Sequence, residues 1–119
     1  MYSIILPSFK EVNNIDLLVD EIFSVLIKDI EIIVIDDFSN DGTEELLKKK
    51  IKKYKKLKYL IRYTDKGLAK SIYEGILLSQ NNNIIVMDCD YNHNPKDIIQ
   101  LINKFEKNNL DFVSASRFK

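Results

Sequence analysis

The chain has 119 residues, of which 45% are hydrophobic, and its 18 basic residues balance its 18 acidic ones. This length and apolar content are typical of a single domain with a buried core, which we expect to span residues 1–119. The balanced charge excludes a global electrostatic field that would attract nucleic acid or anionic lipid, so we expect no nucleic-acid partner.

Five short apolar runs, rich in β-branched residues, alternate with longer segments of helical periodicity. The runs occupy residues 2–7, 30–36, 57–63, 83–88 and 110–116. Most of them are apolar on both faces, which is typical of parallel strands covered by helices on each side. The alternation predicts βαβ units, and right-handed crossovers give the strand order 3-2-1-4 plus a further strand. The predicted architecture is an open, mainly parallel, Rossmann-like α/β sheet with helices on both faces.

Four segments between these runs carry apolar residues at the spacing of an amphipathic helix. The stripes consist of Leu18, Ile22 and Val25; Leu47, Ile51 and Tyr54; Leu68, Ile72 and Ile76; and Ile98, Ile102 and Phe105. Asp41 and Glu44 are placed as a variant of the capping box before the second helix. Asn94 and Pro95 are placed as the N-cap and the first residue of the fourth helix.

The lysine-rich run KKKIKKYKK, residues 48–56, allows two interpretations. The favoured one is a solvated helix end, where lysines also complement the C-terminal dipole. The alternative is peripheral contact with anionic headgroups at the cytoplasmic face of a membrane. The chain has one cysteine and no apolar run near the ~20 residues that span a bilayer, so we expect a cytoplasmic location.

Two carboxylates, Asp88 and Asp90, follow the fourth predicted strand. Parallel α/β sheets bind ligands beyond the carboxyl ends of their strands, and the predicted order places the fourth strand beside the first. A divalent cation would remove the repulsion between the two aspartates, and all-oxygen ligation suits Mg²⁺ or Mn²⁺. The alternative is that one aspartate caps the next helix or loop while the other is solvated.

Further polar residues are expected at the same edge of the sheet. Asp37, which ends the second strand, is suited to accept hydrogen bonds from the N–H groups of a nucleobase, or else it starts the turn at residues 37–42. Arg62 and Arg117 are suited to phosphate oxygens, and their alternative role is an ion pair with the aspartates. His93 is more simply explained as an exposed loop residue, and Cys89 as a small packing residue.

These residues lie in five blocks, which read IILPSFKEVNNI, EIIVIDDFSNDGT, RYTDKGLAKSIYEGI, IIVMDCDYNHNP and DFVSASRF. In order and over essentially the whole chain, the blocks resemble the family 2 inverting glycosyltransferases with the GT-A fold. Within that family they are most similar to the polyprenyl-phosphate sugar transferases, such as the dolichol-phosphate mannose synthases. The resemblance implies a GT-A nucleotide-sugar-binding domain that corresponds to the N-terminal part of such an enzyme.

The resemblance also implies roles for the matching residues. Pro7, Phe9 and Glu11 would line the nucleoside pocket, and Asp37 would meet the base. The metal would bridge the diphosphate of the donor, with an asparagine where a glutamine ligand is usual. The predicted residues are Pro7, Phe9, Glu11, Asp37, Arg62, Lys66, Gly67 and Asp88 for the nucleotide sugar; Asp88, Asp90 and Asn92 for the metal; and Asp90 and Arg117 for catalysis.

The implied reaction is the transfer of mannose or glucose from GDP-mannose or UDP-glucose to a polyprenyl (dolichyl) phosphate, with inversion in one metal-assisted displacement. An acceptor phosphate is already anionic at neutral pH, so the reaction needs no strong general base. Three positions depart from the family pattern: Phe9-Lys10 replaces the frequent Tyr-Asn, Phe38 stands where glycine is usual, and Ala69 replaces the second glycine of Gly-Leu-Gly.

Two alternative functions remain open at the level of the sequence. The chain stops just after Arg117, before the segments that would bind the acceptor. It would then be a nucleotide-sugar-binding module, completed by a partner subunit or by a second copy of itself. The other alternative is a phospho-receiver signalling domain, although its acidic pair would follow the first strand rather than the second.

Overall fold

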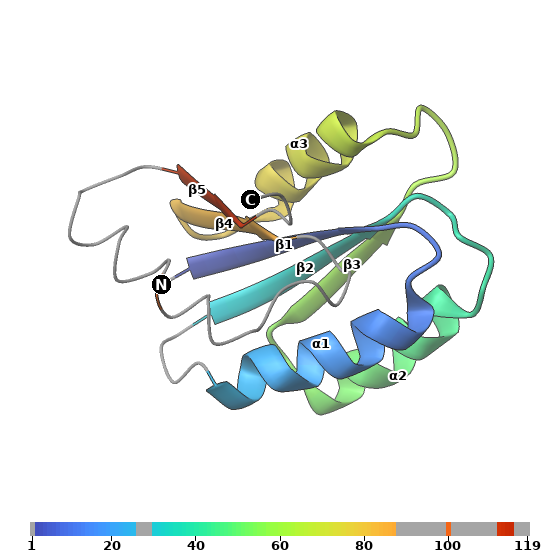
Figure 1. Ribbon diagram of the computed structural model, residues 1–119, viewed down its shortest axis with the longest axis horizontal. Helices are drawn as coiled ribbons and strands as arrows, with labels where there is room; N and C mark the ends of the chain where they lie inside the picture. Colours follow the sequence, from blue (N-terminus) through green and yellow to red (C-terminus); the bar gives the residue numbers. More distant parts are fainter. Residues whose placement is uncertain (1, 26–29, 88–99, 101–111, 116–119) are drawn as a thin grey trace.

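The computed structural model describes residues 2–25, 30–87, 100 and 112–115 (Figure 1). Its described strands form one sheet in the order β3-β2-β1-β4-β5. Every neighbouring pair of strands is parallel. The strands are β1 (Tyr2–Ser8), β2 (Ile30–Asp36), β3 (Leu57–Ile61), β4 (Asn83–Met87) and β5 (Phe112–Ala115). The predicted parallel sheet, its order 3-2-1-4 and the further strand are therefore confirmed.

Helices cover both faces of this sheet, as the apolar character of the strands predicts. The described helices are α1 (Val12–Val25), α2 (Thr43–Lys53) and α3 (Leu68–Leu78). Figure 1 shows α1 and α2 on one face and α3 on the other. None of these described helices has the length and apolar character that crossing a membrane requires. The predicted stripe of Ile98, Ile102 and Phe105 lies outside the described residues.

Alternate residues of the strands build two apolar clusters, one under each layer of helices. Ile4 and Ile32 belong to the cluster on the side of α1 and α2, and both side chains are fully buried. Ile5 and Ile33 point to the other side and pack with Ile72 of α3. A Cβ atom at Gly75 would lie 2.6 Å from Cγ2 of Ile5, so glycine lets α3 approach the sheet closely.

The start of α2 differs from the predicted capping box. Its N-cap is Gly42, which has a φ of 95° and makes no side-chain cap hydrogen bond. Asp41 lies one residue earlier, where its Oδ1 accepts hydrogen bonds from the backbone N–H and the hydroxyl of Thr43 at 3.2 and 2.5 Å. The capping-box prediction is wrong because a glycine in the left-handed conformation turns the chain into the helix one residue later.

Lys50 is the exception in the lysine-rich run, because its side chain is only 8% exposed. Its Nζ lies 2.7 Å from Asp16 and 2.9 Å from Asp20 of α1. Burial opposes the charged ammonium, but the hydrogen bonds that Lys50 donates to both carboxylates outweigh it and raise the pKa of Lys50. The hydroxyl of Tyr54 also donates to Asp20 at 2.6 Å. Lys50 therefore joins α1 to α2, while Lys48, Lys49 and several other lysines of the run are exposed.

Glu31 lies near the amino-terminal end of β2, and its side chain joins neighbouring segments there. Its buried carboxylate accepts hydrogen bonds from the hydroxyl of Ser3 at 2.5 Å and from the N–H of Gln80 at 2.7 Å. Lys58 lies 2.9 Å away. Burial disfavours the charged carboxylate, but these three partners outweigh burial and lower the pKa of Glu31. Glu31 thereby fixes the chain between α3 and β4 to the central strands.

We expect the stabilising effect of Glu31 to depend on pH. Because its folded-state pKa is lowered, the contribution is present at neutral pH and is lost as pH falls below the usual value of about 4.3 toward the lowered one. The variant Glu31→Gln should lose about 1–3 kcal/mol of unfolding free energy at pH 7, and the difference should shrink by pH 3. Urea unfolding at both pH values measures this; an equal difference at both would contradict the assignment. The exposed Glu45→Gln serves as the control.

Candidate functional site

The carboxyl ends of β1, β2 and β3 lie in one row. Ser8 is paired with Asp36, and Asp36 is paired with Ile61, so the three strands end side by side. Pro7, near the end of β1, and six residues of the loops that follow the strands are predicted to bind the nucleotide sugar. The six are Phe9, Glu11, Asp37, Arg62, Lys66 and Gly67. The predicted convergence of these segments at one edge is therefore found for the part of the chain that the structure describes.

Asp37 connects the end of β2 to the loop that follows β3. Its Oδ1 lies 3.3 Å from Nη1 of Arg62 and accepts a hydrogen bond from the hydroxyl of Ser71 at 2.8 Å. Its Oδ2 accepts a hydrogen bond from the N–H of Gly67, the N-cap of α3, at 2.9 Å. Arg62 therefore forms an ion pair with Asp37, which is the alternative role considered for it from the sequence. Contact of Asp37 with a nucleobase and of Arg62 with phosphate stays a prediction.

Asp36, the neighbouring carboxylate, is 2% exposed and binds the other two loops. It accepts hydrogen bonds from the hydroxyls of Ser8 and Ser39 at 2.7 and 2.6 Å, and from the N–H of Ser39 at 2.9 Å. The hydroxyl oxygen of Ser39 in turn accepts a hydrogen bond from the N–H of Lys10 at 2.6 Å. Asp36 thus fixes the loops after β1 and β2 relative to each other.

A hollow of about 170 Å³ opens between these loops and α3. Pro7, Phe9 and Asp37 line it, together with Ser8, Leu68 and Ser71. Pockets that enclose a whole drug-sized ligand measure roughly 300–1,000 Å³. This hollow is therefore suited to one part of a nucleotide sugar, such as its base, while the rest of the ligand would extend over the edge.

Glu11 and Lys66 lie in the loops that follow β1 and β3. Glu11 precedes α1, where its carbonyl oxygen accepts a hydrogen bond from the N–H of Ile15 at 2.8 Å. Its carboxylate accepts a hydrogen bond from the amide of Asn14 at 3.2 Å. Lys66 is exposed, and its Nζ lies 5.9 Å from the centroid of the Phe9 ring. Both residues are thus close to the loops where the sequence predicts the nucleoside.

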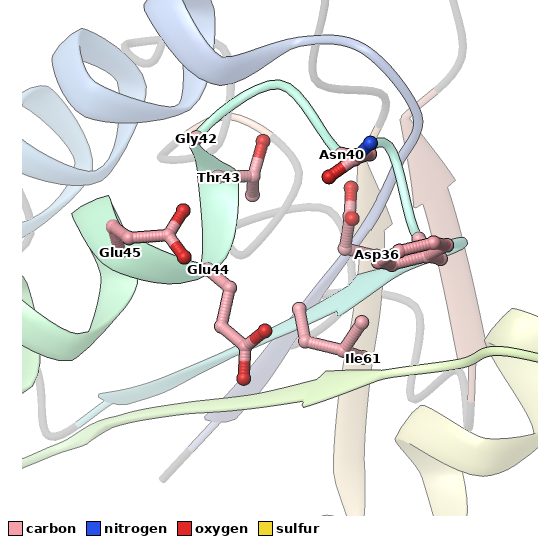
Figure 2. A pocket seen from close by; sticks show the side chains of 8 residues that line it. Asp36, Asn40, Gly42, Thr43, Glu44, Glu45 and Ile61 are labelled. Atoms are coloured by element: carbon pink, nitrogen blue, oxygen red, sulfur yellow. The ribbon is translucent and has the colours of Figure 1, made fainter.

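A smaller pocket on the α2 side of the edge is acidic. It has a volume of about 30 Å³, which holds water but no larger ligand. Figure 2 shows the carboxylates of Asp36, Glu44 and Glu45 around it. A diphosphate would be repelled by this arrangement. The hollow next to α3 is therefore the better candidate for nucleotide binding.

The residues predicted to bind metal lie outside the described residues. Asp88, Asp90 and Asn92 follow β4, and Arg117 follows β5; Cys89 and His93 are likewise outside. Among the described residues, no group of three or more His, Cys, Asp or Glu side chains is arranged to hold a metal ion. The metal site stays a prediction.

Three serines of the edge were not identified from the sequence: Ser8, Ser39 and Ser71. Their hydroxyls bond to Asp36 or Asp37, and all three are buried. Ser71 had a signal that could have been read, because it precedes Ile72 and lies four residues before Gly75 on the side of α3 that faces the sheet. A small polar residue on such a face indicates a hydrogen bond to a strand end.

The parallel sheet, with helices on both faces and a hollow at the carboxyl ends of its strands, defines an open α/β protein. The chain matches the family described as Glycosyl transferase family 2 over residues 3–119. The chain therefore belongs to glycosyltransferase family 2. The family expected from the five sequence blocks is confirmed.

Three relatives match most of the chain. A dolichol-phosphate mannosyltransferase of Pyrococcus furiosus is 33% identical over 117 residues, which make up 98% of this chain and 33% of that protein. The dolichol-phosphate mannosyltransferase of Saccharomyces cerevisiae is 27% identical, over 84% of this chain and 39% of that protein. An uncharacterized protein of Methanocaldococcus jannaschii is 35% identical, over 95% of this chain and 50% of that protein. The chain thus spans half or less of these relatives.

A solved structure supports the fold. The mannosyltransferase PcManGT of Pyrobaculum calidifontis, determined in complex with GDP-Man and Mn²⁺, matches with a TM-score of 0.68 at 19% identity. The match covers 75% of this chain and 27% of that protein. The GT-A fold expected from the sequence is therefore confirmed.

We expect the bonds of Asp37 to contribute measurably to stability. The side chains of Asp37 and Arg62 are 13% and 8% exposed, so the variant Asp37→Asn leaves a nearly buried guanidinium without its counter-charge. The unfolding free energy should fall by about 1–3 kcal/mol in urea titrations. Asp65→Asn is the matched control, because Asp65 lies in the loop after β3, as Arg62 does, but its carboxylate pairs with Lys70 at the surface. Equal stability of the two variants would show that the Asp37 contacts carry no energy.

Proposed function

We propose that the chain is the donor-binding part of a glycosyltransferase that moves a hexose, preferentially mannose, from a nucleotide diphosphate sugar to a polyprenyl phosphate. The observation that carries the proposal is the hollow beside Asp37, at the edge where a family 2 chain is expected to bind its nucleotide. The names of the two dolichol-phosphate mannosyltransferases support the choice of sugar and acceptor. Because the chain belongs to a glycosyltransferase family, the phospho-receiver alternative is set aside.

The pairing of β4 and β5 supports the predicted place of the metal and of Arg117. Met87 ends β4 and is paired with Ala115, the last residue of β5. Asp88 is the next residue after Met87, and Arg117 follows Ala115 by two positions. Strand β4 also runs parallel to β1, beside the hollow. This pairing supports the proposal that Asp88 and Arg117 act at the same end of the sheet as the nucleotide.

The side chains predicted to bind metal suit a hard divalent cation. Asp88, Asp90 and Asn92 offer only oxygen ligands, which suit Mg²⁺ or Mn²⁺ with water and phosphate oxygens completing the shell. When bound, the ion would neutralise charge on the diphosphate as the bond to the sugar breaks. Arg117 would add a second positive charge to the leaving diphosphate.

The other residues of the site would position the donor rather than react. Asp37 holds the loop that carries Lys66 and Gly67, and Asp36 holds the loop that carries Phe9. With the nucleoside fixed, the anionic oxygen of the acceptor phosphate attacks the anomeric carbon from the side opposite the diphosphate. One displacement of this kind inverts the configuration, and no side chain has to remove a proton.

Metal-dependent binding of a nucleotide sugar is the first test. GDP-mannose or UDP-glucose with Mn²⁺ should raise the melting temperature of the chain by several degrees, because ligand at 100 times its Kd adds about 2.7 kcal/mol of stability. The variant Asp88→Ala should lose the metal-dependent part of this shift, and Glu45→Ala should keep it. If Asp88→Ala leaves the shift unchanged, the assigned metal site is wrong.

Turnover separates an enzyme from a binding module. With Mn²⁺, a polyprenyl phosphate and the nucleotide sugar that binds, an active chain should release nucleoside diphosphate and form an inverted glycosyl lipid. Arg117→Ala should lower kcat by about a hundredfold while the donor still binds, because the arginine acts on charge that grows in the transition state. Donor binding with no product would instead assign the alternative of a nucleotide-sugar-binding module.

A further inference from the structure

We propose that Phe38 is a nucleobase-stacking residue, whose ring and that of Phe9 border the space in which the base of the nucleotide sugar lies. The inference rests on the proposed function and deepens it. It concerns this chain in particular, because glycine is usual at the position of Phe38 in the family that the sequence resembles.

The backbone of Phe38 is in a conformation that a phenylalanine rarely adopts. Its φ is 45°, in the left-handed region that favours glycine and asparagine. Hydrogen bonds on both sides impose this turn: the N–H of Asp37 donates to the carbonyl of Ser8 at 3.0 Å, and the N–H of Ser39 donates to Asp36 at 2.9 Å. A glycine would relieve the strain, so a large ring at this position calls for a use that offsets it.

Core packing does not supply that use, because 38% of Phe38 is exposed. Its ring contacts Tyr63, at 4.8 Å between centroids and an interplanar angle of 48°. Tyr63 is itself 58% exposed and lies beyond the end of β3. The two rings therefore form part of the surface at the strand ends, next to the candidate site.

Lys66 shows that the rings of Phe38 and Phe9 border one space. Its Nζ lies 5.5 Å from the centroid of Phe38 and 5.9 Å from the centroid of Phe9. A single ammonium group thus reaches both rings. Phe9, which is 52% exposed, also lines the hollow beside Asp37. Phe38 itself lines the smaller pocket on the α2 side. One ammonium therefore bridges a ring of the hollow and a ring of that smaller pocket.

Exposed aromatic faces of this kind bind planar bases by stacking. A cation over an exposed ring is held only weakly, so a base can take the place of the Lys66 ammonium. The displaced ammonium then stays within reach of the anionic part of the same ligand. Two rings and a lysine match a nucleotide better than a neutral sugar, which offers neither an aromatic face nor a negative charge.

Equilibrium binding of GDP and of UDP, each with Mn²⁺, tests the role of the ring. Phe38→Leu should weaken binding of the nucleotide that the wild type binds by about tenfold, because it removes the aromatic face and keeps an apolar side chain. Phe38→Tyr should restore wild-type affinity. Phe38→Asn should bind as weakly as Phe38→Leu and yet melt no lower than the wild type, because asparagine tolerates the left-handed conformation.

Tyr73→Leu is the control, since Tyr73 is 60% exposed on α3 and lines neither the hollow nor the smaller pocket. Wild-type affinity of Phe38→Leu for the nucleotide would overturn the inference and leave the proposed function standing. Failure of the wild type to bind either nucleotide would overturn the proposed function itself. If Phe38→Leu weakened binding only to vesicles of anionic phospholipid, the rings would belong to a membrane contact, and the inference would be wrong.

Discussion

Two adjacent carboxylates at the end of β2 hold the candidate site together. Successive side chains of a strand point to opposite faces, so Asp36 lies on the side of α1 and α2, and Asp37 on the side of α3. Asp36 binds the loops after β1 and β2 through serine hydroxyls. Asp37 binds the loop after β3 and the first turn of α3. The side chains of these two neighbouring residues therefore fix all three described loops at the carboxyl ends of the strands. Their bonds give the hollow between the loops its shape.

The same bonds offset strain in these loops. Four non-glycine residues of the described chain have a positive φ, and all lie at this edge: Lys10, Phe38, Asn40 and Asp65. Each such residue costs up to about 1–2 kcal/mol, less for asparagine and aspartate. The N–H of Lys10 bonds to Ser39, and the carbonyl of Asp65 accepts from Arg62, so both turns are held by groups that contact the carboxylates. Strain gathered in loops that a buried network holds in place is typical of binding sites.

The sequence was sufficient for the sheet but not for the network that shapes the site. Residue type determines which side chains are buried, so the apolar runs and helical stripes are visible in the sequence. Their alternation, with right-handed crossovers, predicted the strand order. Asp37 and Arg62 were predicted at the carboxyl ends of the strands because each is a charged residue that follows an apolar run. The serines that bind the carboxylates and the buried Lys50 were missed, because a hydroxyl or an ammonium finds its partner only once distant segments are packed. Phe38 was noticed as a departure from a family pattern, yet its strain and its neighbours are visible only in three dimensions.

The electrostatics of the described edge explain why a donor would need help from β4 and β5. In this part of the chain Arg62 faces Asp37, so its charge is largely neutralised, and the acidic side chains of α2 stand on the other side. Lys10 and Lys66 lie over aromatic rings and contribute exposed positive charge. These groups suit a base and a ribose far better than a diphosphate, whose negative charges require a cation of fixed position. We therefore propose a division of the ligand, in which the nucleoside lies over β1 to β3 and the diphosphate faces the metal and arginine proposed beyond β4 and β5.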